Sequence, residues 1–202
     1  MNALISFLLG MIMAFMSSIQ LKQFGADIYV ASLVSFSMVS ELGPVMTAIV
    51  VAGRSGSAYA AEIASMKISE EVDALFSMGM DPVLFLAVPR IIAAMVVVPV
   101  LILFSDLFAI SGGMVVGVFI LGLSPNTYLK QSMVVLSFQE VGWSVFKTFV
   151  FAGLIAWTGC LRGFQAKGGA SAVGQAATSS VVTAIFLIIL FDSLFAIIRS
   201  YW

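Results

Sequence analysis

Histidine is absent from the 202 residues, cysteine occurs once, and charged residues make up only 9% of the chain. Because histidine is the commonest metal ligand and the usual general base, its absence disfavours most metal-dependent and hydrolytic chemistries. The single Cys160 excludes an internal disulfide. A formal net charge of -1 offers no basic surface for nucleic acid. The composition therefore argues against nucleic-acid binding and against most classes of enzyme.

Apolar residues are abundant instead, at 61% of the chain, which indicates an all-α integral membrane protein. An α-helix needs roughly 20 residues to cross the hydrocarbon core, and five apolar runs reach that length. They cover about 1–21, 30–52, 83–121, 132–161 and 173–198. The first run lacks a basic leading segment and an A-x-A cleavage site, so we interpret it as a retained span rather than a signal peptide.

The third run is long enough for one span or two, since Pro99, Asp106 and the Ser111-Gly112-Gly113 triplet interrupt it. The distribution of basic residues favours one span, because five crossings then place most of them on the cytoplasmic side. That side would hold Arg54, Lys67, Arg90, Arg162 and Lys167, with Lys22, Lys130 and Arg199 opposite. We predict five spans in a single transmembrane domain covering 1–202, with the N-terminus inside and the C-terminus outside.

Small residues recur at four-residue spacing, a pattern that allows helices to approach closely. The positions are Gly113 and Gly117, Gly159 and Gly163, and Ala170, Gly174 and Thr178. We interpret them as internal packing contacts.

A polar segment from Gly53 to Arg90 separates the second and third runs. Its inner charged residues are Glu62, Lys67, Glu70, Glu71, Asp73 and Asp81. Ser69 is expected to cap a short helix whose first turn carries Glu70 and Glu71, near the positive end of the helix dipole. Gly79 then supplies a C-terminal stop, and Pro82 prevents continuation.

The expected helix is amphipathic. Val72, Leu75, Phe76 and Gly79 follow three-and-four spacing, and the opposite face holds Glu70, Asp73 and Ser77. A helix of about nine residues is marginal alone in water and needs a surface on which to pack. Its acidic face opposes binding to anionic lipid, so we favour a groove in a partner protein over the headgroup layer.

Three strings resemble the MlaE permease family, the membrane subunits of ABC-type lipid transporters that work with MCE-domain proteins. They are ELGP at 41–44, GRSGSAYAAEI at 53–63 and EEVDALFSMGMDPVLFLAVPR at 70–90. The resemblance continues through QLKQFGADIYVASLV and GGASAVGQAATSSVV into the final span, so it covers nearly the whole chain. The chain differs from the family in having Ser40 where an arginine is common. The sequence also starts almost directly with an apolar run, where family members usually have a surface helix first, so it is truncated, has a misassigned start or belongs to a member without that helix.

The resemblance implies a homodimeric permease in a bacterial inner membrane that grips two cytoplasmic ATPase subunits. It implies that the short helix is the coupling helix, with Glu70, Glu71, Asp73, Ala74, Leu75, Phe76 and Gly79 in contact with the ATPase. The expected cargo is phospholipid or a related lipid, exchanged with a periplasmic MCE-domain assembly. No cofactor is expected on this chain, since ATP would be bound by the partner subunit. Consistent with that, no G-x-x-x-x-G-K-[ST] motif occurs, and Arg54 between Gly53 and Gly56 is interpreted as a headgroup anchor.

Glu41 lies near the middle of the second run, where an ionised carboxylate costs several kcal/mol and is usually functional or paired. One hypothesis is that Glu41, with Leu42, Gly43 and Pro44, lines a cavity for a lipid headgroup. Met13 belongs to a methionine-rich and phenylalanine-rich surface of the first run that would contact acyl chains, although ordinary packing explains it equally well. The alternative for Glu41 is a protonated or hydrogen-bonded structural acid.

Lys147 and Asp192 are expected at similar depths in the fourth and fifth spans, where an ion pair between them would be structural. Two other functions remain open besides an ATP-driven permease. One is an ATP-independent secondary transporter with Glu41 as a proton-linked site, and the other is a membrane scaffold that does not transport. An intramembrane enzyme is disfavoured, because no nucleophile and base pair is evident.

Overall fold

The computed structural model describes residues 1–201, and every regular element within them is helical. Five helical stretches are long and apolar enough to cross a membrane, which confirms the predicted all-α class and the predicted number of spans. They are Asn2–Lys22, Tyr29–Ile68, Val83–Phe119, Phe138–Gln165 and Ser171–Tyr201. Which end faces the cytoplasm stays a prediction.

The contacts divide the chain into two compact units, which are described separately. Unit 1 comprises residues 1–47 and 100–146. It contains α1 (Asn2–Lys22), α2 (Tyr29–Ser37), η1 (Met38–Leu42), the first part of α3 (Gly43–Val51), the second part of α6 (Val88–Phe119), α7 (Pro125–Val135) and the start of α8 (Phe138–Gln165). Its apolar core is built from Ala14, Val30, Val34, Met38, Ala109 and Val116.

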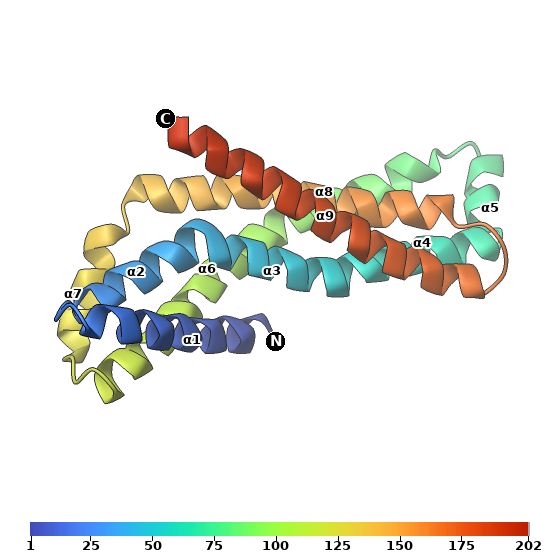
Figure 1. Cartoon of the computed structure of the whole chain (residues 1–202). Coiled ribbons are helices and arrows are strands. Elements are labelled where there is room, and N and C mark those ends of the chain that lie inside the picture. The colour runs from blue at the N-terminus through green and yellow to red at the C-terminus, as the bar shows by residue number, and fades with distance from the viewer. Residues whose placement is uncertain (202) are drawn as a thin grey trace. The chain divides into compact units, whose positions relative to one another are not determined.

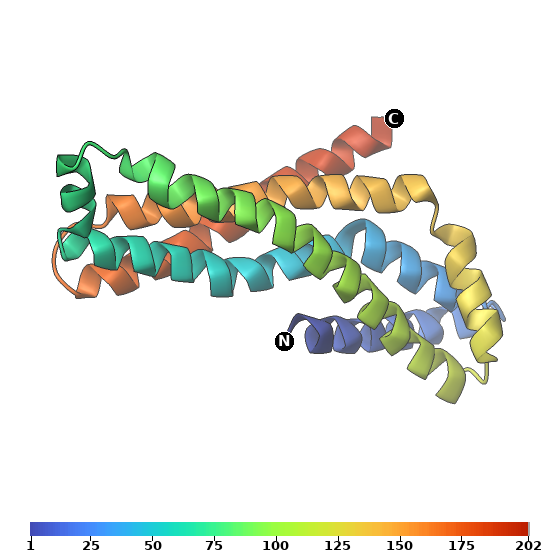
Figure 2. The same cartoon turned by 180° about the vertical axis from the view of Figure 1, so that it is seen from behind.

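Unit 2 comprises residues 48–99 and the described residues from 147 onward. It contains the end of α3, η2 (Ala52–Gly56), α4 (Ser57–Ile68), α5 (Glu71–Ser77), η3 (Val83–Ala87), the first part of α6, most of α8, and α9 (Ser171–Tyr201). Helix α4 packs along α9, and α5 turns across the end of α4 (Figures 1 and 2). The apolar contacts at this end of the unit include Ala64, Ala166 and Ala176.

The second helix does not end at residue 52, as the apolar run had suggested. It continues without a break to Ile68, so half of the polar segment is a helical extension of the span. Gly53 and Gly56 lie within a π-helical turn, η2, rather than at a helix end. Because a π turn keeps the backbone hydrogen-bonded, glycine and polar side chains were insufficient to stop the helix.

Two other expected boundaries also differ. The third run forms one continuous helix through Pro99, Asp106 and Gly112, so it is one span. Residues 132–135, assigned to the fourth span, belong instead to the separate helix α7, which begins with the Ser124 hydroxyl accepting from the Thr127 N–H at 3.2 Å. An N-cap serine followed by Pro125 is a typical helix start, and the following break at Leu136 separates α7 from α8.

Several glycines do mark close approaches. In unit 1 a side chain at Gly10 would collide with the Ala109 carbonyl, and one at Gly112 with that of Phe7, so α1 and α6 cross backbone to backbone. In unit 2 a Cβ at Gly159 would lie 2.8 Å from the Gly56 oxygen. The close packing expected at Gly159 and Gly163 is therefore confirmed. At Gly174 it is wrong, because an added Cβ would meet no described atom within 4 Å.

Candidate functional site

The ELGP string lies at a π-helical turn in the second span. Glu41 belongs to η1, and the N–H of the next helical residue, Gly43, bonds to the Met38 carbonyl five residues back. The wider turn has a simple cause: the ring of Pro44 would clash with the carbonyl four residues earlier in an ordinary α-helix. The same arrangement recurs at η3, where Val88 bonds to Val83 and Pro89 follows. At η1 and η3 the residue that closes the π turn, Gly43 or Val88, directly precedes a proline, whereas η2 has no proline after it.

Gly43 contacts a buried carboxyl group from another helix of unit 1. Asp106 on α6 is 6% exposed, and its Oδ1 atom occupies the space that a side chain at Gly43 would need. Among the described residues this oxygen has no hydrogen-bond partner. The sequence had marked Asp106 only as an interruption of an apolar run, although an acid inside a span is itself a signal of function.

Ser105, the neighbour of Asp106 in sequence, belongs to a group of three buried hydroxyls. The Ser105 Oγ lies 2.6 Å from the Ser6 Oγ and accepts from the Thr47 Oγ1 at 2.8 Å. These side chains come from α1, α3 and α6, so the chain gathers polar atoms from three spans of unit 1. A hydrogen-bonded chain of this kind keeps polar groups tolerable in an apolar setting. No sequence motif predicted it, because single serines and threonines in apolar runs are common.

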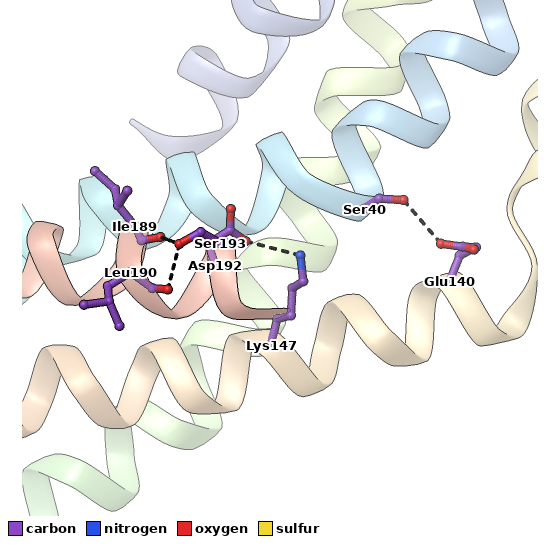
Figure 3. Close-up of polar contacts among 7 residues, drawn as sticks. All are labelled: Ser40, Glu140, Lys147, Ile189, Leu190, Asp192 and Ser193. Carbon is purple, nitrogen blue, oxygen red and sulfur yellow. Dashed lines mark hydrogen bonds and ion pairs between the residues drawn. The ribbon is translucent and has the colours of Figure 1, made fainter. Parts of the chain in front are cut away.

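A second acid also lies near the ELGP string. The Ser40 hydroxyl donates to the Glu140 Oε2 at 3.3 Å, joining residues 100 positions apart within unit 1 (Figure 3). Glu41 itself is half-buried and engaged in an interaction. Ser40, Glu41, Asp106 and Glu140 form what we call the acidic cluster of unit 1. The sequence analysis singled out Glu41 alone and missed Glu140, although Glu140 lies inside the fourth apolar run, 132–161.

Two other residues of the expected cavity are packing residues in the described structure. Met13 and Leu42 are half-buried and lie against the apolar core of unit 1. Pro44 is buried as well. A role of Met13, Leu42 and Pro44 in substrate binding stays a prediction.

The short helix α5 forms as expected, but its start differs. Ser69 does not cap it: Ser69 ends α4, and its hydroxyl donates to the Ser65 carbonyl at 3.0 Å and to the Glu71 carboxylate at 3.0 Å. The turn into α5 is made by Glu70, whose φ of 63° lies in the left-handed region. The seven-residue helix then begins at Glu71. The continuation of α4 up to Ile68 leaves Ser69 no extended backbone from which to cap a new helix.

The end of α5 agrees with the prediction. Gly79 has a φ of 77°, its N–H bonds to the Phe76 carbonyl at 3.0 Å, and the Met80 N–H bonds to Leu75 at 3.1 Å. This paired arrangement is a Schellman motif, which favours glycine at the left-handed position. The Asp81 carboxylate then accepts from the Val83 N–H at 2.9 Å and starts the next helix, with Pro82 in its first turn.

The faces of α5 separate only in part as the spacing predicted, because Phe76 and Gly79 of the apolar stripe are exposed. Val72 is buried and Leu75 half-buried, so these two residues attach the helix to unit 2. Phe76 is 75% exposed and Met78 64% exposed. The acidic residues and Ala74 are exposed around them, namely Glu70, Glu71, Asp73 and Ala74. The helix therefore presents a small apolar surface with an acidic border.

The comparisons with known proteins agree on one family. The family model described as Permease MlaE matches residues 1–198. A probable ABC transporter permease protein of Rickettsia typhi is 37% identical over 188 residues, which are 93% of this chain and 73% of that protein. One from Synechocystis is 36% identical over 179 residues, 89% of this chain and 68% of the relative.

The chain belongs to the MlaE permease family. It is a multi-pass membrane protein and a permease of the ABC transporter type. A more distant relative in Pyropia yezoensis, also named a probable ABC transporter permease protein, is 31% identical over 163 residues.

In this permease, charged contacts fix the base of α5 within unit 2. The Arg90 guanidinium donates to the Glu62 carboxylate at 3.0 Å and to the Leu86 carbonyl at 2.8 Å. The Lys67 ammonium bonds to the Phe164 carbonyl at the end of α8. These contacts join α4 to α6 and α8, so α5 is held by elements that themselves are cross-linked.

The permease also contains the ion pair expected from its sequence. The Lys147 Nζ lies 3.2 Å from the Asp192 Oδ1, between α8 and α9 of unit 2 (Figure 3). Within residues 1–201 no group of three histidine, cysteine or acidic side chains is arranged to hold a metal ion.

Proposed function

We propose that this permease moves phospholipid or a related lipid between a bacterial inner membrane and a periplasmic MCE-domain assembly, driven by separate cytoplasmic ATPase subunits. The observation that supports this proposal most strongly is the exposed apolar surface of α5, formed by Phe76 and Met78 in a polar setting. The chain contains no G-x-x-x-x-G-K-[ST] motif, and in this proposal the energy comes from the partner ATPase.

The chemistry of α5 favours a protein groove as its binding partner. A large aromatic side chain exposed at the centre of a short amphipathic helix is typical of helix-in-groove recognition. The exposed Glu70, Glu71 and Asp73 would be repelled by an anionic leaflet. We infer that an ATPase subunit receives Phe76 in an apolar groove and pairs basic residues with the acidic border. A change in the spacing of two such helices in a homodimer would transmit nucleotide binding to the spans.

The acidic cluster of unit 1 supports a polar ligand at membrane depth. Charged groups in spans are costly and mark substrate pathways or structural pairs. The hydroxyl chain of Ser6, Thr47 and Ser105 and the carboxyl of Asp106 add hydrogen-bonding capacity next to the ELGP string. A lipid headgroup needs such polar partners, whereas its acyl chains need only the apolar surfaces of the spans. We propose that Glu41 contacts the headgroup.

The coupling part of the proposal is tested by purifying the tagged permease in mild detergent and measuring the ATPase that co-purifies. Phe76→Ala should reduce the co-purified ATPase strongly while leaving permease abundance unchanged, because Phe76 packs little against its own chain. Met133→Ala is the matched control, since Met133 is an exposed apolar residue on α7. Equal ATPase recovery from both variants would argue against α5 as the coupling helix.

The transport part is tested with Glu41→Ala in proteoliposomes that contain the complex. Lipid transfer should fall while co-purified ATPase and the oligomeric state stay as in the wild type. Transfer that persists without ATPase would favour the secondary-transporter function. If Glu41→Ala leaves lipid transfer unchanged while Phe76→Ala abolishes ATPase assembly, the results would favour a scaffold that does not transport.

A further inference from the structure

A cavity of about 320 Å³ lies in unit 2 where α8 ends and α9 begins. Its polar lining consists of Arg162, Gln165, Lys167, Gln175 and Ser179, and alanines form the rest. Two of these alanines, Ala166 and Ala176, belong to a small apolar core with Ala64, so the floor of the cavity is fixed. This cavity shares no residue with the acidic cluster or with α5.

The cavity has an excess of positive charge. Arg162 donates to the Thr183 hydroxyl at 3.0 Å and to the Gln165 side-chain oxygen at 3.3 Å. Its Nε–H is buried and has no hydrogen-bond partner among the described residues. Neither Arg162 nor Lys167 forms an ion pair within residues 1–201, and no acidic residue lines the cavity. Two uncompensated cations with amide and hydroxyl donors around them form a site for an anion.

The start of α9 adds to this potential. The helix is 31 residues long and has no acidic residue in its first turn. The positive end of its dipole therefore lies close to Ala172 and Gln175, which line the cavity, and favours negative charge there. Planar guanidinium groups together with lysine and a helix start are the groups that proteins use for phosphate.

An apolar stripe on α9 leads away from the cavity. Gln175 and Ser179 line the cavity, and the same face continues through Val182, Phe186 and Ile189, which are all exposed. The spacing of four, three, four and three residues places them on one side of the helix. A lipid would place its charged head in the cavity and its chains along this stripe, whereas a soluble anion or an acidic protein loop would leave the stripe unused.

We propose that this cavity binds the phosphate of an anionic lipid headgroup, with the acyl chains lying along α9. Its position at the ends of two membrane-spanning helices is where headgroups of one leaflet lie. The site stands independently of the proposed transport function, because a lipid bound here need not be cargo.

The test measures how far each added ligand raises the melting temperature of the permease in neutral detergent, and compares the wild type with two variants. The probes are dihexanoyl-phosphatidylglycerol, dihexanoyl-phosphatidylcholine and inorganic phosphate. The pocket variant is Arg162→Gln with Lys167→Gln. The charge-matched control is Lys22→Gln with Lys130→Gln, two exposed cations outside the cavity. Melting without ligand and gel filtration show whether each variant is folded.

Phosphatidylglycerol should stabilise the wild type and the control at similar concentrations. The pocket variant should need about tenfold more of it, since losing charge-assisted hydrogen bonds weakens binding by at least that factor. Phosphatidylcholine should bind more weakly to the wild type, and raising the salt concentration should weaken phosphatidylglycerol binding. If the double variant does not fold, Lys167→Gln alone serves, because Lys167 is exposed in the loop after α8.

Three results would overturn the proposal. Equal stabilisation of the pocket variant and the wild type would exclude the cavity as the site. Inorganic phosphate acting as well as phosphatidylglycerol would assign the site to a free anion and remove the role of the apolar stripe. Loss of co-purified ATPase from the pocket variant, with unchanged lipid binding, would identify a protein contact instead.

Discussion

Lys147 and Asp192 form an unequal ion pair: the lysine side chain is fully buried, whereas the aspartate retains 22% exposure. Removing Asp192 leaves a buried ammonium without its carboxylate, which costs about 3–5 kcal/mol for a buried pair. Asp192→Ala should therefore lower permease abundance and melting temperature strongly. Lys147→Ala should also lower both, because it leaves the Asp192 carboxylate without Lys147 inside a membrane-spanning helix. The double variant should recover part of the loss of Asp192→Ala.

The control for this cycle is Ser193→Ala. The Ser193 hydroxyl bonds only to its own helix, at the Ile189 and Leu190 carbonyls (Figure 3). Its replacement should change stability by about 0.5 kcal/mol or less. Strictly additive losses for Lys147→Ala and Asp192→Ala would show that the two residues are not coupled.

Gly43→Ala should destabilise the permease by about 1–3 kcal/mol, the usual cost of overpacking a filled site. A methyl group there would collide with the Asp106 carboxyl and lie 2.6 Å from the Met38 carbonyl oxygen. Adding Asp106→Ala should restore stability only in part, because the Met38 carbonyl stays. Gly53→Ala is the matched control, since a methyl group there meets no described atom within 4 Å. Equal melting temperatures for the two single variants would contradict the assigned contact.

The helices could be predicted from apolar run length, since lipid forces every spanning segment to satisfy its own backbone. Their interruptions could not. A proline such as Pro44 or Pro89 signals a disturbed helix, yet whether the helix kinks, ends or forms a π turn depends on surrounding packing. Here both prolines follow a π turn, and the spans continue. The polar string after Val51 was misinterpreted for the same reason.

The candidate site was predictable where one segment encodes it. The faces of α5 and the stop at Gly79 follow from local spacing and backbone preference. The contacts of Asp106 with Gly43 and of Glu140 with Ser40 join residues far apart in sequence. Apolar spans can pack in many registers, and a single sequence does not specify which polar side chains meet.

Gly79→Val should loosen the end of α5, because a β-branched residue is strained at a φ of 77°. The cost is on the order of 1–2 kcal/mol. Hydrogen exchange of the segment 71–80 should accelerate, above all at Met80, whose N–H closes the motif. Gly79→Asn should be milder, since asparagine tolerates the left-handed conformation. Gly169→Val is the control, because an added Cβ at Gly169 has open space. If this control variant accelerated exchange of the segment 71–80 as much as Gly79→Val does, a specific effect of Gly79 would be excluded.

Tyr128 on α7 should make the permease sensitive to alkaline pH. Its ring packs on Gly113 and Gly117 of α6, the phenol is buried, and the hydroxyl has no hydrogen-bond partner among the described residues. Burial raises the pKa of Tyr128 to about 12 from an ordinary value of 10.0. A raised pKa means that the folded state holds the phenolic proton longer than the unfolded state does. The resulting stability is complete below pH 10 and is lost as the pH rises toward 12, by about 2–3 kcal/mol at most.

Tyr128→Phe removes this titration and leaves the packing surface intact. At pH 7 the variant should match or slightly exceed the wild type, because replacing an unpartnered hydroxyl relieves its desolvation. At pH 10.5 to 11 the melting temperature of the wild type should fall further than that of the variant. Tyr29→Phe, at an exposed position, controls for general alkaline effects. Its melting temperature should fall in parallel with that of the wild type as the pH rises. A wild type and Tyr128→Phe variant that lose stability in parallel above pH 10 would place the Tyr128 phenol in contact with water.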